Sequence, residues 1–106
     1  MLSLTIDPPV VCQVIENRSA DVARLALRVE AARGTAGRYN LIVRKTDPAG
    51  TATMQQGGGF DIAEGDVREV GKLTISVRPD GQLSVDASVQ VDGRKIGCAY
   101  DSTQDL

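Results

Sequence analysis

Apolar and polar residues alternate with a period of two through the second half of the chain. The alternation runs through residues 67–77, 82–91 and 94–100, and turn residues separate these three segments. A period of two is typical of β-strands that bury one face. We therefore expect three strands here. Their expected core side chains are Leu73, Ile75, Val77, Leu83, Val85, Ala87, Val89, Val91, Ile96, Cys98 and Tyr100.

The turns between these segments set their pairing. Asp92-Gly93 is a strong hairpin signal, because a two-residue type I′ turn needs positive φ at both central residues. That turn predicts the pairs Val91–Arg94, Val89–Ile96, Ala87–Cys98 and Val85–Tyr100. The earlier corner, residues 78–81 (Arg-Pro-Asp-Gly), fits either a tight hairpin or a crossing between two sheets, and both keep the same residues inward.

The first half of the chain predicts four further strands. Residues 10–17 and 38–46 alternate, and residues 51–56 are short and polar, as expected of a strand at a sheet edge. Residues 21–32 have a helix-favouring composition. Every second residue is nevertheless apolar, with Arg24, Ala26, Arg28 and Glu30 in between, so we expect a strand. These alternating residues are Leu25, Leu27, Val29 and Ala31.

Seven closely spaced strands predict an all-β protein with an immunoglobulin-like antiparallel β-sandwich. We expect one such domain over residues 1–106, with loose ends at 1–9 and 101–106. The three glycines at 57–59 are expected to form a flexible connection, and Phe60 to cap one end of the core.

The chain has two cysteines, Cys12 and Cys98, near its opposite ends. The hairpin register turns Cys98 inward, and Cys12 alternates with the inward Val10 and Val14. We therefore predict a Cys12–Cys98 disulfide, which is typical of an oxidising compartment. The alternative is a pair of buried free thiols.

The residues that most enzymes use are scarce. Without histidine, the common catalytic triads, imidazole acid–base chemistry and typical zinc sites are excluded. Asp61, Glu64 and Asp66 lack the regular spacing of a calcium loop. The two distant cysteines do not form a redox motif. We expect no catalytic residue, metal or cofactor, and hence no enzyme.

Charge is unevenly distributed, although the net charge is only −2, which predicts neither a nucleic-acid nor a membrane partner. Residues 18–45 hold seven basic and two acidic residues, a local net charge of +5. Arg24 and Arg28 lie on the predicted solvent face. Lys72 and Arg78 join them in one basic face if the second and fifth strands are neighbours. Arg44 and Lys45 form a second candidate cluster. The alternative is that these charges only provide solubility and block edge pairing.

Several segments, in order, resemble those of a known family. They are an early lone Cys12, the run 37–43 (Gly-Arg-Tyr-Asn-Leu-Ile-Val), the run 56–62 (Gln-Gly-Gly-Gly-Phe-Asp-Ile), the run 65–77 and the late Cys98. Over about residues 10–100 the chain resembles the alphaproteobacterial branch of the CsgC-like curli chaperones, which inhibit amyloid formation. Enteric relatives carry Cys-x-Cys where this chain has Val11-Cys12-Gln13, which argues against redox chemistry.

The resemblance implies a periplasmic, immunoglobulin-like protein that keeps curli subunits from polymerising early, guided by electrostatic attraction. The implied partner is the curli major subunit or a related amyloidogenic protein, and we expect a monomer. The candidate client-binding residues are Arg24, Arg28, Lys72, Arg78, Arg44 and Lys45. The alternative function is a non-catalytic structural or adhesion-type module of a secretion or surface assembly.

Overall fold

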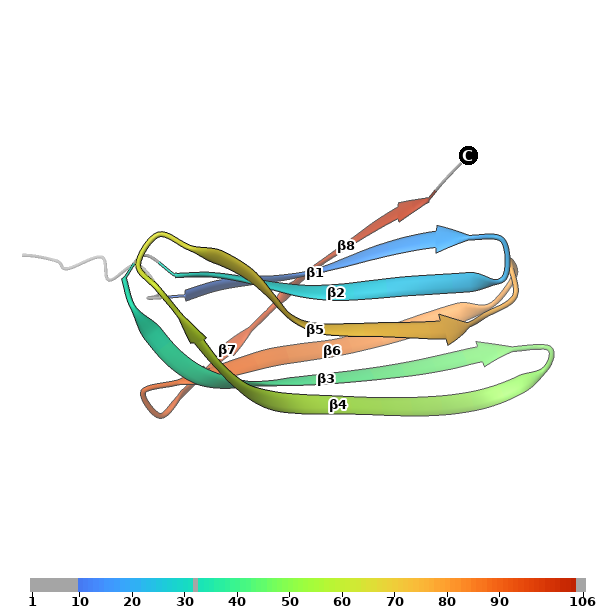
Figure 1. Ribbon diagram of the computed structural model, residues 1–106. Coiled ribbons are helices and arrows are strands. Elements are labelled where there is room, and N and C mark those ends of the chain that lie inside the picture. Colours follow the sequence, from blue (N-terminus) through green and yellow to red (C-terminus); the bar gives the residue numbers. More distant parts are fainter. Residues whose placement is uncertain (1–9, 32, 105–106) are drawn as a thin grey trace, which may run out of the picture.

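Eight β-strands form two four-stranded sheets that pack face to face (Figure 1). The computed structural model describes residues 10–31 and 33–104, and the side chains as far as Tyr100. The predicted loose arm at 1–9 lies outside the described residues. The strands are β1 (Val10–Ser19), β2 (Val22–Ala31), β3 (Thr35–Asp47), β4 (Gly50–Ile62), β5 (Val67–Ser76), β6 (Gln82–Val91), β7 (Arg94–Gly97) and β8 (Ala99–Gln104).

The first sheet has the order β5-β2-β1-β8, and the second has the order β4-β3-β6-β7. Because β5 and β6 belong to different sheets, the corner at residues 78–81 is a crossing and not a hairpin. All neighbouring strands are antiparallel except β1 and β8. The predicted all-β immunoglobulin-like sandwich is confirmed, with eight strands in place of about seven.

The extra strand arises because the predicted last strand divides between the two sheets. Its first part, β7, forms the predicted hairpin with β6, in which Val89 lies opposite Ile96. The turn residues Asp92 and Gly93 have φ angles of 52° and 74°, so both have the positive φ that this turn requires.

The second part, β8, crosses to the first sheet (Figure 1). The Cys98 N–H still donates a hydrogen bond to the Ala87 carbonyl at 3.0 Å, but Tyr100 then lies opposite Val14 of β1. The predicted Val85–Tyr100 pair is therefore wrong. The predicted core position of Tyr100 is wrong too, because at this sheet edge its side chain is 44% exposed. The loose end predicted from residue 101 is also wrong for residues 101–104, which pair with β1.

The two segments with the weakest sequence evidence for a strand, β2 and β4, are both strands in the structure. In β2, burial of the alternating apolar side chains outweighs the helix-favouring composition. β4 lies at a sheet edge as predicted, but it has 13 residues instead of six. The flexible connection predicted at 57–59 is wrong, because all three glycines pair with β3.

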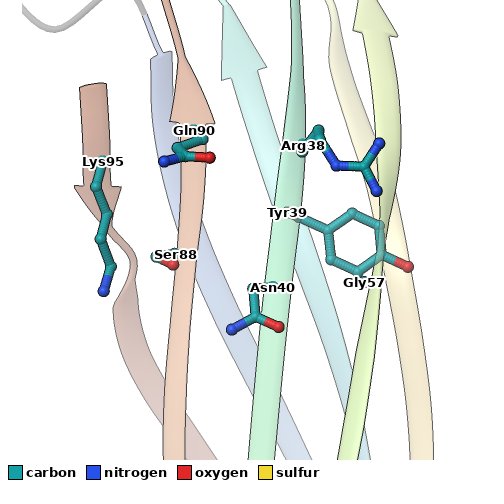
Figure 2. A pocket seen from close by; sticks show the side chains of 7 residues that line it. All are labelled: Arg38, Tyr39, Asn40, Gly57, Ser88, Gln90 and Lys95. Carbon is teal, nitrogen blue, oxygen red and sulfur yellow. The ribbon is translucent and has the colours of Figure 1, made fainter. Parts of the chain in front are cut away.

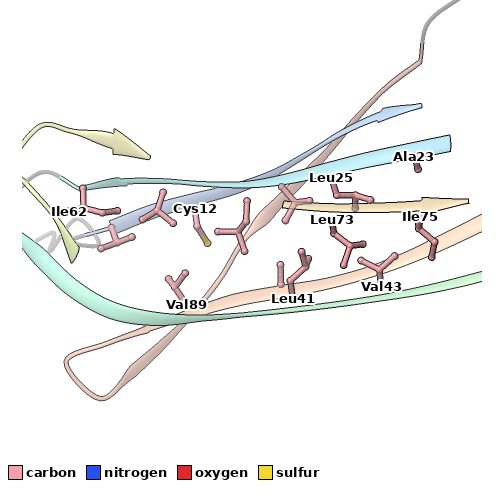
Figure 3. Packing of buried hydrophobic residues seen from close by; sticks show 14 of the residues in the cluster. Cys12, Ala23, Leu25, Leu41, Val43, Ile62, Leu73, Ile75 and Val89 are labelled. Carbon is pink, nitrogen blue, oxygen red and sulfur yellow. The ribbon is translucent and has the colours of Figure 1, made fainter. Parts of the chain in front are cut away.

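The core lies between the two sheets (Figure 3). Each fully buried Leu, Ile or Val side chain contributes about 1.5–3 kcal/mol. Phe60 packs against this cluster while staying partly exposed. The predicted Cys12–Cys98 disulfide is confirmed, and it joins β1 to the crossing between β7 and β8. Among the described residues, no helix has the length and apolarity that crossing a membrane requires. The largest fully buried apolar side chains are Leu25, Leu27, Leu41, Ile62, Val10, Val14, Val29, Val43, Val77, Val89 and Val91.

Candidate functional site

The solvent side of the β5-β2-β1-β8 sheet, called here the first outer face, carries three of the predicted basic residues. Arg24 and Arg28 are exposed on β2, and Lys72 lies on the neighbouring β5, opposite Ala26. The structure thus brings these three cations onto one face. The face also carries Glu30, and Glu69 opposite Arg28. Because Lys72 pairs with Glu69 at 3.2 Å, the face is less basic than the sequence predicts.

A hollow of about 280 Å³ lies in the first outer face between β1, β2 and β5. Ile15 and Ala26, which are opposite each other, supply apolar surface to its lining. Arg24 and Lys72 are among the polar residues around it. Glu69, the partner of Lys72, also lines it, so the hollow combines apolar surface with a charged rim in which cations outnumber carboxylates. Its lining comes from three strands, so no single stretch of sequence predicts it.

Arg78 lies away from this face. It follows the end of β5, in the crossing between the sheets, where its backbone N–H donates to Asp47 Oδ2 at 3.1 Å. It lines a hollow of about 380 Å³ together with Asp21, Lys45 and Asp47. The predicted grouping of Arg78 with Arg28 is therefore wrong, because β5 ends before Arg78.

Asp47 organises this end of the molecule. The Arg78 N–H is the largest influence that lowers the pKa of the Asp47 carboxyl below its ordinary value. The Ala49 N–H at 2.8 Å and the Lys45 ammonium at 3.4 Å lower it further, against a desolvation effect that raises it. A carboxylate with these donors joins the β3–β4 turn to the crossing after β5.

The predicted Arg44–Lys45 cluster is wrong, because the two side chains point to opposite faces. Arg44 is exposed on the second sheet, between Thr53 of β4 and Ser84 of β6. Lys45 points inward at the end of the core, where its side chain is 16% exposed and pairs with Asp47. The sequence could have indicated this, because consecutive side chains in a strand point to opposite faces.

The solvent side of the β4-β3-β6-β7 sheet, called here the second outer face, was not predicted as a site. Arg38, Arg44 and Lys95 are its cations, and Asp86 is a carboxylate between them on β6. A polar hollow of about 380 Å³ includes Arg38, Gly57 and Lys95 in its lining (Figure 2). The outward residues of β3 were the signal that could have indicated this face. Its amide and hydroxyl side chains include Asn40, Gln55, Ser84, Ser88 and Gln90.

A buried ionic cluster that was not predicted from the sequence secures the edge of the first sheet. Glu16 on β1 is only 1% exposed. Arg18 Nε lies 3.1 Å from Glu16 Oε2, and the Tyr100 hydroxyl donates to Glu16 Oε1. Arg18 Nη1 also donates to the Gly81 carbonyl at 3.1 Å. The cluster therefore joins β1, β8 and the crossing before β6.

Metal and thiol chemistry find little support in the part of the chain that the structure describes. Asp61, Glu64 and Asp66 do not form a group that could hold a metal ion, and no other such group occurs among the described residues. Both cysteines are in the disulfide.

These features define an immunoglobulin-like β-sandwich that carries one disulfide and two charged outer faces. The chain is similar to CsgH of R. palustris, with 27% identity and a TM-score of 0.68, over 84% of this chain and 88% of that one. It also matches the E. coli curli protein CsgC at 13% identity and a TM-score of 0.68, over 84% of this chain and 93% of CsgC. The predicted resemblance to CsgC-like curli proteins is confirmed.

A more distant match shows the fold alone. Spo0M, a sporulation control protein of Bacillus subtilis, is 9% identical over 92% of this chain and 51% of its own, with a TM-score of 0.51. No protein-family model matches the chain, and a search of curated protein sequences finds no match either.

Proposed function

We propose that this protein is a periplasmic chaperone that delays the amyloid polymerisation of curli subunits. The similarity to R. palustris CsgH over 84% of the chain is the observation that carries the proposal. It agrees with the CsgC-like resemblance of the sequence segments. The Cys12–Cys98 disulfide supports an oxidising compartment such as the periplasm. The role needs neither catalysis nor a cofactor, because the folded surface itself contacts the client.

The first outer face supplies the attraction in this proposal. Arg24 and Arg28 are exposed, and neither forms an ion pair with another described residue. Their charges are therefore free to attract carboxylates of an unfolded client. Electrostatic attraction speeds encounter and weakens as salt rises. The hollow lined by Arg24 and Lys72 offers apolar surface for a client side chain.

Contact with a folded sandwich interferes with how amyloid grows. A fibril lengthens when an identical strand adds in register to an exposed edge, with like side chains stacked on one another. A client segment held on this protein lacks identical neighbours. Short-lived contacts with early assemblies therefore lengthen the lag before fibrils appear.

The test is a thioflavin assay with purified curli major subunit. We expect a longer lag at low salt when this protein is present in less than equimolar amount. The effect should shrink between 0.1 M and 1 M salt, as the Debye length falls from about 10 Å to about 3 Å. An unchanged lag at every ratio would refute the chaperone function and favour a structural or adhesion-type module.

A double charge-reversal variant tests whether the first outer face attracts the client. We expect Arg24→Glu with Arg28→Glu to need more protein for the same delay, by about three- to tenfold, since exposed charges each contribute roughly 0–1 kcal/mol. Arg33→Glu with Arg94→Glu is the matched control, because it makes the same change in net charge at exposed positions outside both outer faces. Equal losses in the two variants would show that only net charge matters.

A further inference from the structure

We propose that the free edge of β4, together with Arg38, binds an extended, carboxylate-bearing strand of the amyloid subunit. The strand would pair with β4 and extend the second sheet. This inference rests on the proposed function and adds to it the place and mode of capture.

The β4 edge lacks the features that normally block strand addition. β4 pairs with β3 over 13 residues, and it pairs with no other strand in the described part of the chain. From Thr51 to Phe60 its sequence has neither a charged residue nor a proline. Natural sheet edges are usually protected by charges, prolines, bulges or short length. A ten-residue uncharged edge therefore favours backbone pairing with another chain.

The other described edges carry such protection. β5 has three charged residues and a register shift between Leu27 and Arg28 of its partner strand. β7 has only four residues and includes Arg94 and Lys95. β8 has six residues, and the part of β6 that β7 leaves uncovered includes Asp86. The contrast singles out β4. The charged residues of β5 are Arg68, Glu69 and Lys72.

The glycines of β4 leave room beside this edge. A Cβ atom at Gly58 would lie 3.2 Å from the Tyr39 ring, so internal packing explains that glycine. At Gly59 the nearest atom to an added Cβ would be 3.7 Å away, which is an ordinary contact. Packing therefore does not require glycine at position 59. A glycine within a strand often marks a place where another backbone approaches closely.

Arg38 gives the edge a charge preference. It lies on β3 opposite Gly59, so no β4 side chain stands beside it on that side. Its side chain extends toward β4, whereas Lys95 lies on the far side of β6 (Figure 2). Among the described residues, no carboxylate forms an ion pair with Arg38. A strand that adds to β4 and carries a carboxylate near Gly59 would supply this partner.

This mode of binding competes directly with fibril growth. A client strand on β4 makes the same kind of backbone hydrogen bonds that it would make to another subunit. Its neighbour is then the Thr-, Gln- and Gly-rich β4 instead of an identical strand. The client segment is removed from the fibril register while it stays bound.

Met54 provides the test. It lies opposite the buried Val43, points to the core side of the edge and is 36% exposed. An inward charge at an edge blocks strand addition, because the added strand would bury the charge. We expect Met54→Lys to lose most of the delay in the thioflavin assay, and Met54→Leu to keep it. Arg38→Gln should show a partial loss.

Amide hydrogen exchange gives an independent measurement with wild-type protein. In the presence of monomeric curli major subunit, we expect slower exchange at alternate amides within residues 51–60, namely those that do not already bond to β3. Unchanged exchange at these amides would overturn the inference, and so would a Met54→Lys variant that delays amyloid formation as fully as wild type does. In either case, a delay caused by the wild-type protein would still support the proposed function. If wild type causes no delay, the proposed function itself fails. Sedimentation of the protein without client is the last measurement. If wild type is a dimer and Met54→Lys is a monomer, the β4 edge binds a second copy of this chain, which would also overturn the inference.

Discussion

β8 and β4 are both edge strands, one in each sheet, but the protein secures them very differently. β8 begins directly after the disulfide-bonded Cys98, and Tyr100 within it donates a hydrogen bond to the buried Glu16. β4 is held by its pairing with β3, by the Asp47 turn and by one side-chain hydrogen bond to β5, in which Gln56 Nε2 donates to the Lys72 carbonyl at 2.9 Å. Its other edge carries neither charge nor proline between Thr51 and Phe60.

We propose that this difference separates the residues that stabilise the fold from those that bind the client. The disulfide and the hydrogen bond to the buried Glu16 hold β8 against β1, so this edge is fixed by contacts within the chain. The β4 side leaves backbone groups available, which is a hazard unless a protein uses the edge. We therefore expect substitutions near β8 to change the free energy of unfolding, and substitutions on β4 to change client binding.

The largest expected effect comes from the disulfide. We expect Cys12→Ala with Cys98→Ala to lower the free energy of unfolding by about 2–5 kcal/mol, because the bond constrains a long loop in the unfolded chain. Urea unfolding followed by circular dichroism measures it. The folded variant should still delay amyloid formation. Loss of delay in a folded variant would show that the disulfide side takes part in binding.

The ionic cluster comes next. We expect Glu16→Ala to cost about 2–3 kcal/mol, because it leaves Arg18 without its buried partner while that cation keeps some access to water. Tyr100→Phe removes only one hydrogen bond and should cost about 1 kcal/mol. Urea unfolding of both variants tests the order. A larger effect of Tyr100→Phe would contradict the central place of Glu16.

Asp47 should make the start of β4 sensitive to acid. Its pKa is lowered in the folded state, so its stabilising effect is complete above the ordinary value of 3.8 and is lost as the pH falls through the lower folded value. We expect Asp47→Asn to unfold more easily at pH 7 and to lose less stability than wild type between pH 5 and pH 2. Parallel pH curves for the two proteins would contradict this role.

The smallest effect on stability is expected on the open edge. Met54→Lys should change the free energy of unfolding by no more than about 0.5–1 kcal/mol, since the lysine ammonium can reach water beside the edge. Thermal unfolding alongside Met54→Leu measures the difference. A loss as large as that of the disulfide variant would mean that this edge is part of the stable core.

Much of the strand pattern could be predicted, because the alternation of apolar and polar residues indicates directly which side chains face inward. It identified β2 against its helical composition, and it placed Cys12 and Cys98 toward the core. The same alternation puts Glu16 at an inward position, where an acidic residue signals a buried partner. Alternation also excludes a shared face for the consecutive Arg44 and Lys45.

Sheet membership could not be predicted in the same way. The inward pattern of residues 94–100 is the same whether they stay beside β6 or cross to β1, so the separate β8 was missed. Composition misled at residues 57–59, because glycine disfavours strands unless pairing with a neighbour compensates. The hollows were missed because each combines residues from several strands.

Association and dissociation rates with immobilised monomeric curli major subunit test the central claim most directly. Charge on the first outer face should govern encounter, and the β4 edge should govern residence. We predict that Arg24→Glu with Arg28→Glu lowers the association rate and its salt dependence, with little change in dissociation. We predict the reverse for Met54→Lys, namely faster dissociation at a nearly unchanged association rate. If both variants changed the same rate constant, or neither differed from wild type, the assignment of encounter to the first outer face and of residence to the β4 edge would be wrong.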